Sequence, residues 1–380
     1  MPDVVLFGAT GYTGRLTARA LARRGADFAV AGRDPAKLAR IADETGATAT
    51  HRVAVGDVDA LVRALDGARV LVTCVGPFTT LGDTAAEAAV RAGVHYVDST
   101  GEGEFVARLL DRYDERARAA GIAMAPALGF DEVPADVAAT IAAAGIDDAA
   151  LTLTYALPSH ASAGTIRSAL GIVASEGRAL RAGRPVPVRA AQRLRWAPLP
   201  APLGVRAAMT FPLSSGYVVP LHLPLRSLET YVTTTRARRA LAAVGVPVLR
   251  AVRARAAGRA ALDRLVARAP DGPGDDARAR SRWTILAEAR GPRAWRNVVA
   301  TGTDPYGLTA ETLARGALEM ARPGFAHAGV VAPVQALGLD VAERTLAPAG
   351  VVIDVLGAPR HDARGEEHGR SSSLREGHRP

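Results

Sequence analysis

Three glycines at a fixed spacing point to one chemistry, the binding of phosphate groups. Gly8, Gly11 and Gly14 follow the apolar run Val4–Phe7 and open a helical pattern. In a strand–turn–helix unit, one glycine permits the tight turn, one lets the backbone approach a pyrophosphate, and one lets the helix pack closely on the strand. Unpaired N–H groups at the helix N-terminus then attract the phosphates. The Gly-x-x-Gly-x-x-Gly spacing differs from the commoner Gly-x-Gly-x-x-Gly, but its context predicts a dinucleotide site.

A basic residue follows the second apolar run, Phe28–Gly32. Arg33 lies 25 residues after Gly8, where an acidic residue would hydrogen-bond the ribose of NAD. A planar, always charged guanidinium suits a 2′-phosphate instead. Lys37, the only lysine in the chain, lies one turn into the next helix and would add a second charge. We therefore predict NADP(H) as the cofactor, the alternative being a solvated Arg and Lys at a helix start.

Further cofactor-binding candidates follow later strands. Asp57 is expected either to hydrogen-bond the adenine or to cap the next helix. The segment Cys74, Val75, Gly76 and Pro77 is expected to run under the nicotinamide half, with Gly76 allowing close approach of the backbone. The Cys74 side chain itself is more typical of a small core hydrophobe than of a nucleophile.

A reductase also needs a proton donor or a polarising group beside the hydride acceptor. The Tyr-x-x-x-Lys pair of short-chain reductases is absent, because the single lysine has an arginine four residues before it. Tyr96 and Asp98, at the end of a strand, are our catalytic candidates, with Glu102 nearby. Capping of the turn 101–104 is an equally good role for Asp98.

Other polar residues favour structural roles. Asp131 and Asp136 are expected to cap a helix that begins near Pro134. The histidines in and next to the expected substrate region are more typical of surface or core positions than of acids; they are His160, His222 and His327. Because the eight histidines are scattered, the sequence predicts no metal site.

The first part of the chain alternates strands and helices, which predicts an α/β fold, a Rossmann-type doubly wound parallel sheet with helices on both faces. Right-handed crossovers would give the strand order 3-2-1-4-5-6, with every candidate at the carboxyl edge of the sheet. The expected strands are Val4–Phe7, Phe28–Gly32, Arg52–Val55, Val70–Val75, Val94–Val97 and Ile122–Pro126.

The pattern changes after about residue 147, and an inserted α+β domain with an antiparallel sheet is expected. We predict a nucleotide domain at 1–146, a substrate and dimerisation domain at 147–325, a return segment at 326–357 and a disordered tail at 358–380. The expected strands are Leu151–Leu157, Val186–Trp196, Tyr217–Leu223, Leu228–Thr235, Trp283–Glu288 and Asn297–Thr303. The expected helices are Ser162–Glu176, Thr309–Met320 and the basic stretch Arg236–Ala269, which is broken near 245–247 and more typical of a solvated arginine face than of a membrane-surface helix.

Composition excludes several classes of protein. The chain has 380 residues and a formal charge of +9, but its arginines are dispersed and lack interleaved aromatics, which argues against nucleic-acid binding. One cysteine excludes an internal disulfide and fits a reducing compartment. Without an apolar leader or an uncharged run of about 18 residues, we expect a cytoplasmic homo-oligomer that does not associate with membranes.

Five segments within residues 3–140 carry a family resemblance. They are Gly8-Ala9-Thr10-Gly11-Tyr12-Thr13-Gly14, Ala31-Gly32-Arg33, Val75-Gly76-Pro77-Phe78, Tyr96-Val97-Asp98-Ser99-Thr100-Gly101-Glu102 and Gly129-Phe130-Asp131-Glu132-Val133-Pro134-Ala135-Asp136. Together they resemble the saccharopine dehydrogenase-like reductases, nearest the trans-acting enoyl reductases. The resemblance implies an NADP-dependent reductase, with 2′-phosphate contact at Arg33. It also implies phosphate-binding roles for Gly8, Thr10, Gly11, Tyr12, Thr13 and Gly14.

Three functions remain open from the sequence. The first is hydride transfer from NADPH to an activated C=C bond of a small-molecule, acyl or polyketide-like substrate, with an acyl-carrier or synthase partner. The second is a saccharopine-type oxidoreductase acting on a C–N bond of an amino acid. The third is an NADP(H)-sensing module without chemistry.

Overall fold

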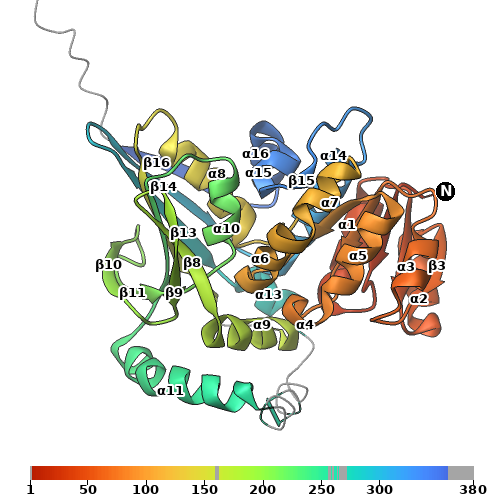
Figure 1. Ribbon diagram of the computed structural model, residues 1–380, viewed down its shortest axis with the longest axis horizontal. Helices are drawn as coiled ribbons and strands as arrows, with labels where there is room; N and C mark the ends of the chain where they lie inside the picture. Colours follow the sequence, from red (N-terminus) through yellow and green to blue (C-terminus); the bar gives the residue numbers. More distant parts are fainter. Residues whose placement is uncertain are drawn as a thin grey trace, which may run out of the picture.

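The computed structural model describes residues 2–158, 162–255 and 272–357, together with Gly258, Ala261, Leu262 and Arg264. His160 and the expected tail at 358–380 lie outside these residues. Figure 1 shows the first sheet and its helices on the right, the second sheet on the left, and α11 across the bottom.

The first domain is a seven-stranded, wholly parallel sheet. Its order, β15-β6-β5-β4-β1-β2-β3, contains the predicted order 3-2-1-4-5-6 and adds one strand from the C-terminal part of the chain. The strands are β1 (Val4–Phe7), β2 (Phe28–Gly32), β3 (Ala49–Arg52), β4 (Val70–Thr73), β5 (His95–Asp98), β6 (Ala123–Ala125) and β15 (Gly329–Val330). The third strand was expected three residues later. As an edge strand it is only half buried and alternates, so apolar content is a poor guide to its bounds.

Both faces of this sheet are covered by helices, which is why β1 is apolar at every position. Val4 and Leu6 pack on one face with α1, α2, α8, α14 and α15, while Val5 and Phe7 pack on the other with α3, α5, α6 and α7. The helices are α1 (Tyr12–Arg23), α2 (Pro35–Thr45), α3 (Val58–Ala64), α4 (Phe78–Leu81), α5 (Asp83–Ala92), α6 (Gly103–Arg112), α7 (Asp114–Ala119), α8 (Glu132–Ala143), α14 (Pro305–Met320), α15 (Pro333–Leu337) and α16 (Leu339–Leu346).

The second domain is built on a nine-stranded sheet with the order β10-β11-β12-β7-β13-β14-β16, to which β8 and β9 add beside β12. We expected it to be antiparallel, but β12 runs parallel to β7, so the sheet is mixed. The strands are β7 (Ala150–Ala156), β8 (Glu176–Arg181), β9 (Arg184–Arg189), β10 (Leu194–Pro198), β11 (Val205–Thr210), β12 (Ser227–Thr233), β13 (Trp283–Arg290), β14 (Trp295–Gly302) and β16 (Val352–Gly357).

Two expected strands of this domain are wrong. The apolar run Tyr217–Leu223 is helical, in α10 (Ser215–Val218) and a following 3₁₀ turn, because Pro220 cannot donate to a sheet ladder and a short apolar run suits either structure. The run Val186–Trp196 is interrupted by a turn in which Ala191 has a φ of 59°.

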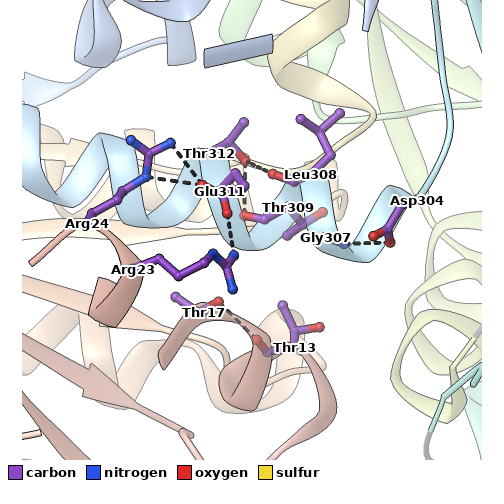
Figure 2. A network of polar contacts seen from close by, with 10 residues as sticks. All are labelled: Thr13, Thr17, Arg23, Arg24, Asp304, Gly307, Leu308, Thr309, Glu311 and Thr312. Atoms are coloured by element: carbon purple, nitrogen blue, oxygen red, sulfur yellow. Dashed lines mark hydrogen bonds and ion pairs between the residues drawn. The ribbon is translucent and has the colours of Figure 1, made fainter. Parts of the chain in front are cut away.

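The helix α14 joins the two domains. It packs against α1, β4 and β5 of the first sheet, although we had placed it in the inserted domain. Figure 2 shows Arg24, the C-cap of α1, and Arg23 paired with Glu311 of α14. Arg24 donates to this carboxylate from Nε at 3.1 Å and from Nη2 at 2.9 Å. In turn α8 packs on β13 and β14, and β16 joins the second sheet. These contacts reassign α14 and β16, and the remaining domain boundaries stay our interpretation.

In Figure 1, α9 (Ala163–Ala174) lies at the bottom between β8 and α4, and α11 (Arg236–Ala254) lies below it at the lower left. The expected break of α11 is wrong, because the helix continues through Pro247. Arg250 of α11 donates to the carbonyls of Ala174 and Ser175, at 3.0 and 2.9 Å, and so satisfies the C-terminus of α9. This packing helps to offset the cost of an interior proline, about 3 kcal/mol. Among the described helices, none combines the length and hydropathy that a membrane crossing requires.

Candidate functional site

The turn between β1 and α1 has the geometry that phosphate binding needs. Gly8 has a φ of 85°, and a Cβ there would lie 2.7 Å from Cγ2 of Val75. A Cβ on Gly14 would lie 2.2 Å from the carbonyl oxygen of Gly8, so the third glycine is needed for the helix to meet the strand. Gly11 is exposed at the N-cap of α1 and provides no side-chain cap. The first N–H groups of α1 are therefore open to an anion.

The other residues of this turn, Thr10, Tyr12 and Thr13, differ in their burial and hydrogen bonds. Thr10 and Thr13 are half-buried, and the Thr13 carbonyl accepts a 2.9 Å hydrogen bond from Thr17. The Tyr12 hydroxyl donates to the Pro273 carbonyl at 2.6 Å, and its ring stacks edge-on against Tyr306 at 5.0 Å. Burial raises the pKa of this phenol. Tyr12 therefore fixes the turn against the second domain, and its phosphate contact stays a prediction.

Arg33 carries an exposed guanidinium with no hydrogen bond or ion pair to any residue that the structure describes. Its neighbour Asp34 caps α2 by accepting from the Lys37 amide at 3.1 Å. The Lys37 ammonium lies 3.8 Å from the same carboxylate. Arg33 is thus the freer of the two predicted charges, and a 2′-phosphate would find it unpaired.

Of the two roles expected for Asp57, adenine contact and helix capping, the structure shows the second. Its Oδ1 accepts from the Ala60 amide at 2.9 Å at the start of α3. Contact with an adenine stays a prediction for this exposed side chain.

The segment after β4 begins with the half-buried Cys74 and continues to the exposed backbone at Gly76. Burial raises the pKa of Cys74 to about 12, and its Sγ lies 3.9 Å from Thr17 Oγ1. The side chain packs with the core, as we expected, and its thiol is inert at neutral pH. Gly76 is exposed and Pro77 begins α4, so this backbone is open to a ligand.

Iodoacetamide at pH 8 is expected to leave Cys74 of the folded chain unmodified over a period in which the urea-unfolded chain is alkylated completely. With a pKa near 12, only about one thiol in ten thousand is ionised at that pH. Mass spectrometry of the intact chain measures the outcome. Stoichiometric alkylation without urea would show that the thiol is neither buried nor inert.

The two predicted catalytic residues form a closed, buried pair. The Tyr96 hydroxyl donates to Asp98 Oδ2 at 2.5 Å, and Oδ1 accepts from the amides of Thr100 and Ala127 at 2.7 and 3.0 Å. Both side chains are fully buried, and burial raises the pKa of Asp98 to about 6. Every oxygen of the pair is occupied in holding the loops after β5 and β6. The pair thus has a structural role in holding these loops, and the catalytic role that we predicted for Tyr96 and Asp98 stays a prediction.

Glu102 is also occupied. Its buried carboxylate accepts from the Phe78 and Thr79 amides at 3.0 Å each, from the Thr79 hydroxyl at 2.7 Å and from the Ser168 hydroxyl at 2.7 Å. It thereby caps α4 and attaches α9 to the carboxyl edge of the sheet. Asp136 caps α15 rather than its own helix, because Oδ2 accepts from the Val334 amide at 2.9 Å.

A second pair of carboxyl groups follows β6. Asp131 is half-buried, and its carboxylate turns back so that a Cβ on Gly129 would lie 2.8 Å from Oδ1. Glu132 is fully buried; its Oε1 accepts from Ser214 at 2.6 Å, and its Oε2 has no hydrogen-bond partner. Burial raises the pKa of Asp131 to about 6 and that of Glu132 to about 8, the latter with help from the Asp131 charge. From the sequence we expected only a capping role for Asp131 and singled out no role for Glu132, although both stand in the last of the five resembling segments.

Residues 4–124 match the family model of the saccharopine dehydrogenase NADP binding domain. The first domain is a saccharopine dehydrogenase-type NADP-binding domain. The resemblance, the Rossmann-type fold and NADP(H) as cofactor are thereby confirmed. No cluster of potential metal ligands occurs among the residues that the structure describes.

Proteins with different names have sequences similar to the saccharopine dehydrogenase-type domain. A trans-acting enoyl reductase of Mycobacterium leprae is 38% identical over 141 residues, which cover 36% of this chain and 34% of the relative. A lipid droplet localized protein of Caenorhabditis elegans is 32% identical over 147 residues, with the same two shares of 36% and 34%. The match therefore spans about a third of the length of these relatives.

The whole chain shares its fold with a solved structure, apo saccharopine dehydrogenase (L-Glu forming) of Saccharomyces cerevisiae. The superposition has a TM-score of 0.60, covers 94% of this chain and 100% of the other, and aligns residues with 13% identity. At that identity the likeness extends to the architecture alone, including the second sheet.

Proposed function

We propose that this protein is a cytoplasmic NADPH-dependent oxidoreductase that reduces an activated C=C bond of an acyl or polyketide-like substrate. The observation that carries the proposal is an open phosphate turn beside an unpaired guanidinium, Arg33, on a saccharopine dehydrogenase-type domain. The relatives named trans-acting enoyl reductases support the choice of bond. By the same likeness, the substrate would arrive on an acyl-carrier or synthase partner.

The residues present fit the cofactor. The N-terminus of α1 would hold the pyrophosphate, Arg33 the 2′-phosphate, and the backbone at Gly76 the nicotinamide half. When bound, NADPH supplies a hydride, and the protein's task is to orient the acceptor and exclude water.

We infer that α9, which lies at the carboxyl edge of the first sheet, contacts the substrate. Ser168 of α9 donates to Glu102, and Thr165 lies 2.9 Å from the Tyr306 hydroxyl of α14. Apart from these polar anchors and Arg167, the helix is mostly apolar, with Ile166 and Leu170 half-buried. An apolar helix fixed over the edge of a nucleotide-binding sheet suits an acyl chain better than an amino acid.

Replacing Arg33 with alanine is expected to weaken NADPH binding by about 10- to 100-fold and to change NADH binding by less than about twofold. Loss of one charge-assisted phosphate contact, about 1.5–3 kcal/mol, accounts for that range. Calorimetry with both coenzymes measures the effect, and the matched control is Arg40→Ala, which removes an exposed arginine from α2, the helix that follows Arg33. Equal losses for both coenzymes, or an equal loss in the control, would refute the assignment.

The reaction class is tested by NADPH oxidation. An enoyl thioester is expected to support turnover, whereas an amino acid with a keto acid is not. Turnover on the second pair alone would place the activity at C–N bonds. Tight NADPH binding with neither substrate consumed would indicate a sensor.

A further inference from the structure

We propose that the hairpin of β10 and β11 binds the surface of a membrane that contains anionic lipids. Figure 1 shows this hairpin at the far left, whereas the first domain lies on the right. The inference goes beyond the proposed reductase function and rests on separate observations. They are the distribution of acids along the chain, an exposed apolar strip on the hairpin, and exposed arginines without partners beside it.

Acidic residues are scarce in the middle of the chain. Residues 177–255 contain 14 arginines and one acid, Glu229, which gives this segment a formal charge of +13. Because the whole chain carries +9, the rest of it has a net negative charge. The arginines are dispersed along the whole sequence, but in this segment they lack the acids that would balance them. Such an asymmetry indicates an anionic partner for the segment.

One face of the hairpin exposes apolar side chains. The residues on this face form three cross-strand pairs, Leu194 with Met209, Trp196 with Ala207 and Pro198 with Val205. Trp196 is 66% exposed, Val205 61% and Leu194 40%, and we call these three residues the apolar strip. The opposite face is apolar too, but it is buried, with Ala197 and Ala208 in a core cluster. A hairpin with one buried face normally turns polar residues outward, so the apolar strip indicates a partner with an apolar layer.

Exposed arginines accompany the apolar strip, and the acid of the segment does not balance them. Glu229 pairs with Arg181 and Arg193, at 3.1 and 2.7 Å. The side chains of Arg184 and Arg206 are exposed and have no hydrogen bond or ion pair with a residue that the structure describes. Arg206 directly follows Val205 of the strip. At physiological ionic strength its charge acts on lipid phosphates over about 8 Å, so it attracts them without direct contact.

The basic segment continues into α11, which begins beside the hairpin. The Thr234 amide donates to the Ala207 carbonyl of β11 at 2.8 Å, and α11 begins two residues later. Arginines stand at positions 236, 238 and 239 in the first turn of this helix. The fold therefore brings further basic residues close to the apolar strip.

An anionic lipid surface fits these features better than an acidic protein or a nucleic acid does. Tryptophan favours the layer between headgroups and acyl chains, and arginine can reach the phosphates from there. A stable protein interface uses about 20–30 residues on each side, far more than the strip contains. A nucleic acid would place phosphates against Leu194 and Val205. We expected no membrane association because the sequence lacks a spanning segment, but surface binding requires only an apolar strip and positive charge.

The first test is flotation with lipid vesicles. The wild type is expected to float with phosphatidylcholine vesicles that contain about 30% phosphatidylglycerol, and not with phosphatidylcholine alone. Trp196→Ala is expected to weaken binding about 10-fold, because it removes the largest apolar contact, and Arg206→Ala about fivefold. The matched controls are Trp295→Ala, which removes an exposed tryptophan from β14, and Arg40→Ala, which removes an exposed arginine from α2.

Both control variants are expected to bind within about twofold of the wild type, because their side chains lie outside the hairpin. A wild type that does not float, or that floats equally well with phosphatidylcholine alone, would overturn the proposal. Unchanged binding by Trp196→Ala, or an equal loss in Trp295→Ala, would also overturn it.

The second test follows the fluorescence of Trp196 itself. In Trp295→Phe the remaining tryptophans are Trp196 and Trp283, and Trp283 is only 2% exposed. Iodide is expected to quench Trp196 in solution, and the anionic vesicles are expected to protect it and to shift its emission to shorter wavelength. Protection by a purified acidic acyl carrier protein but not by vesicles would show a protein docking site and overturn the proposal. Neither test uses coenzyme or substrate, so their outcomes do not bear on the reductase function.

Discussion

Replacing Gly14 with alanine is expected to abolish measurable NADPH binding and to destabilise the first domain. The added Cβ would lie 2.2 Å from the Gly8 carbonyl oxygen and 2.8 Å from the Ala9 Cα, both backbone atoms that cannot rotate away. Overpacking costs about 1–3 kcal/mol even where side chains can yield, and here the helix itself must move off the strand. Since we propose that the first turn of α1 holds the pyrophosphate, we expect that movement to displace the phosphate site as well. Calorimetry and urea unfolding measure the two effects.

Gly11→Ala is the matched control for this prediction. A Cβ on Gly11 meets only the Gly8 carbonyl oxygen, at 3.4 Å, and the backbone there is extended with a φ of −75°. Its free energy of unfolding should therefore stay within about 1 kcal/mol of the wild type, while its exposed Cβ still obstructs the phosphates. A stable Gly14→Ala that binds NADPH normally would contradict the role that we give to the third glycine.

The nucleotide half of the site was predictable because its determinants are local. The turn from Gly8 to Gly14, the basic Arg33 and the strand order follow from residues close together in sequence and from the handedness of crossovers. Strand bounds were less secure where burial was partial, as at β3.

The second domain and the carboxyl groups were less predictable because their partners are distant. The parallel pairing of β7 with β12 joins residues about 77 positions apart, such as Thr154 and Tyr231, and no local pattern distinguishes it from an antiparallel pair. Asp136 caps a helix 198 positions away. A sequence shows that such a carboxylate exists, but only the fold decides whether it is occupied in a buried pair, like Asp98, or exposed to solvent, like Asp111.

The buried acids hold together the elements at the carboxyl edge of the first sheet. Asp98 holds the loops after β5 and β6, and Glu102 joins α4 to α9. Asp136 joins α8 to α15 and His222. Loss of a buried acid should therefore lower stability, whereas loss of an exposed acid should not.

Asp136→Ala is the strongest test of that distinction. The Asp136 carboxylate is fully buried, lies 2.6 Å from His222 Nε2 and accepts from the Val334 amide at 2.9 Å. Alanine would leave the buried Val334 amide and the half-buried His222 ring without this partner, and an unsatisfied buried polar group costs about 1–3 kcal/mol. Urea unfolding should show this loss.

Two variants separate loss of the pair from loss of charge. Asp136→Asn retains one acceptor for the Val334 amide and an amide that can face His222, so it should lose less than the alanine variant. Asp111→Ala removes an exposed carboxylate from α6 and should stay within about 0.5 kcal/mol of the wild type. If Asp136→Ala proved as stable as Asp111→Ala, the buried pair would not hold α15 and the segment around His222 to α8, and the site's backbone would need another support.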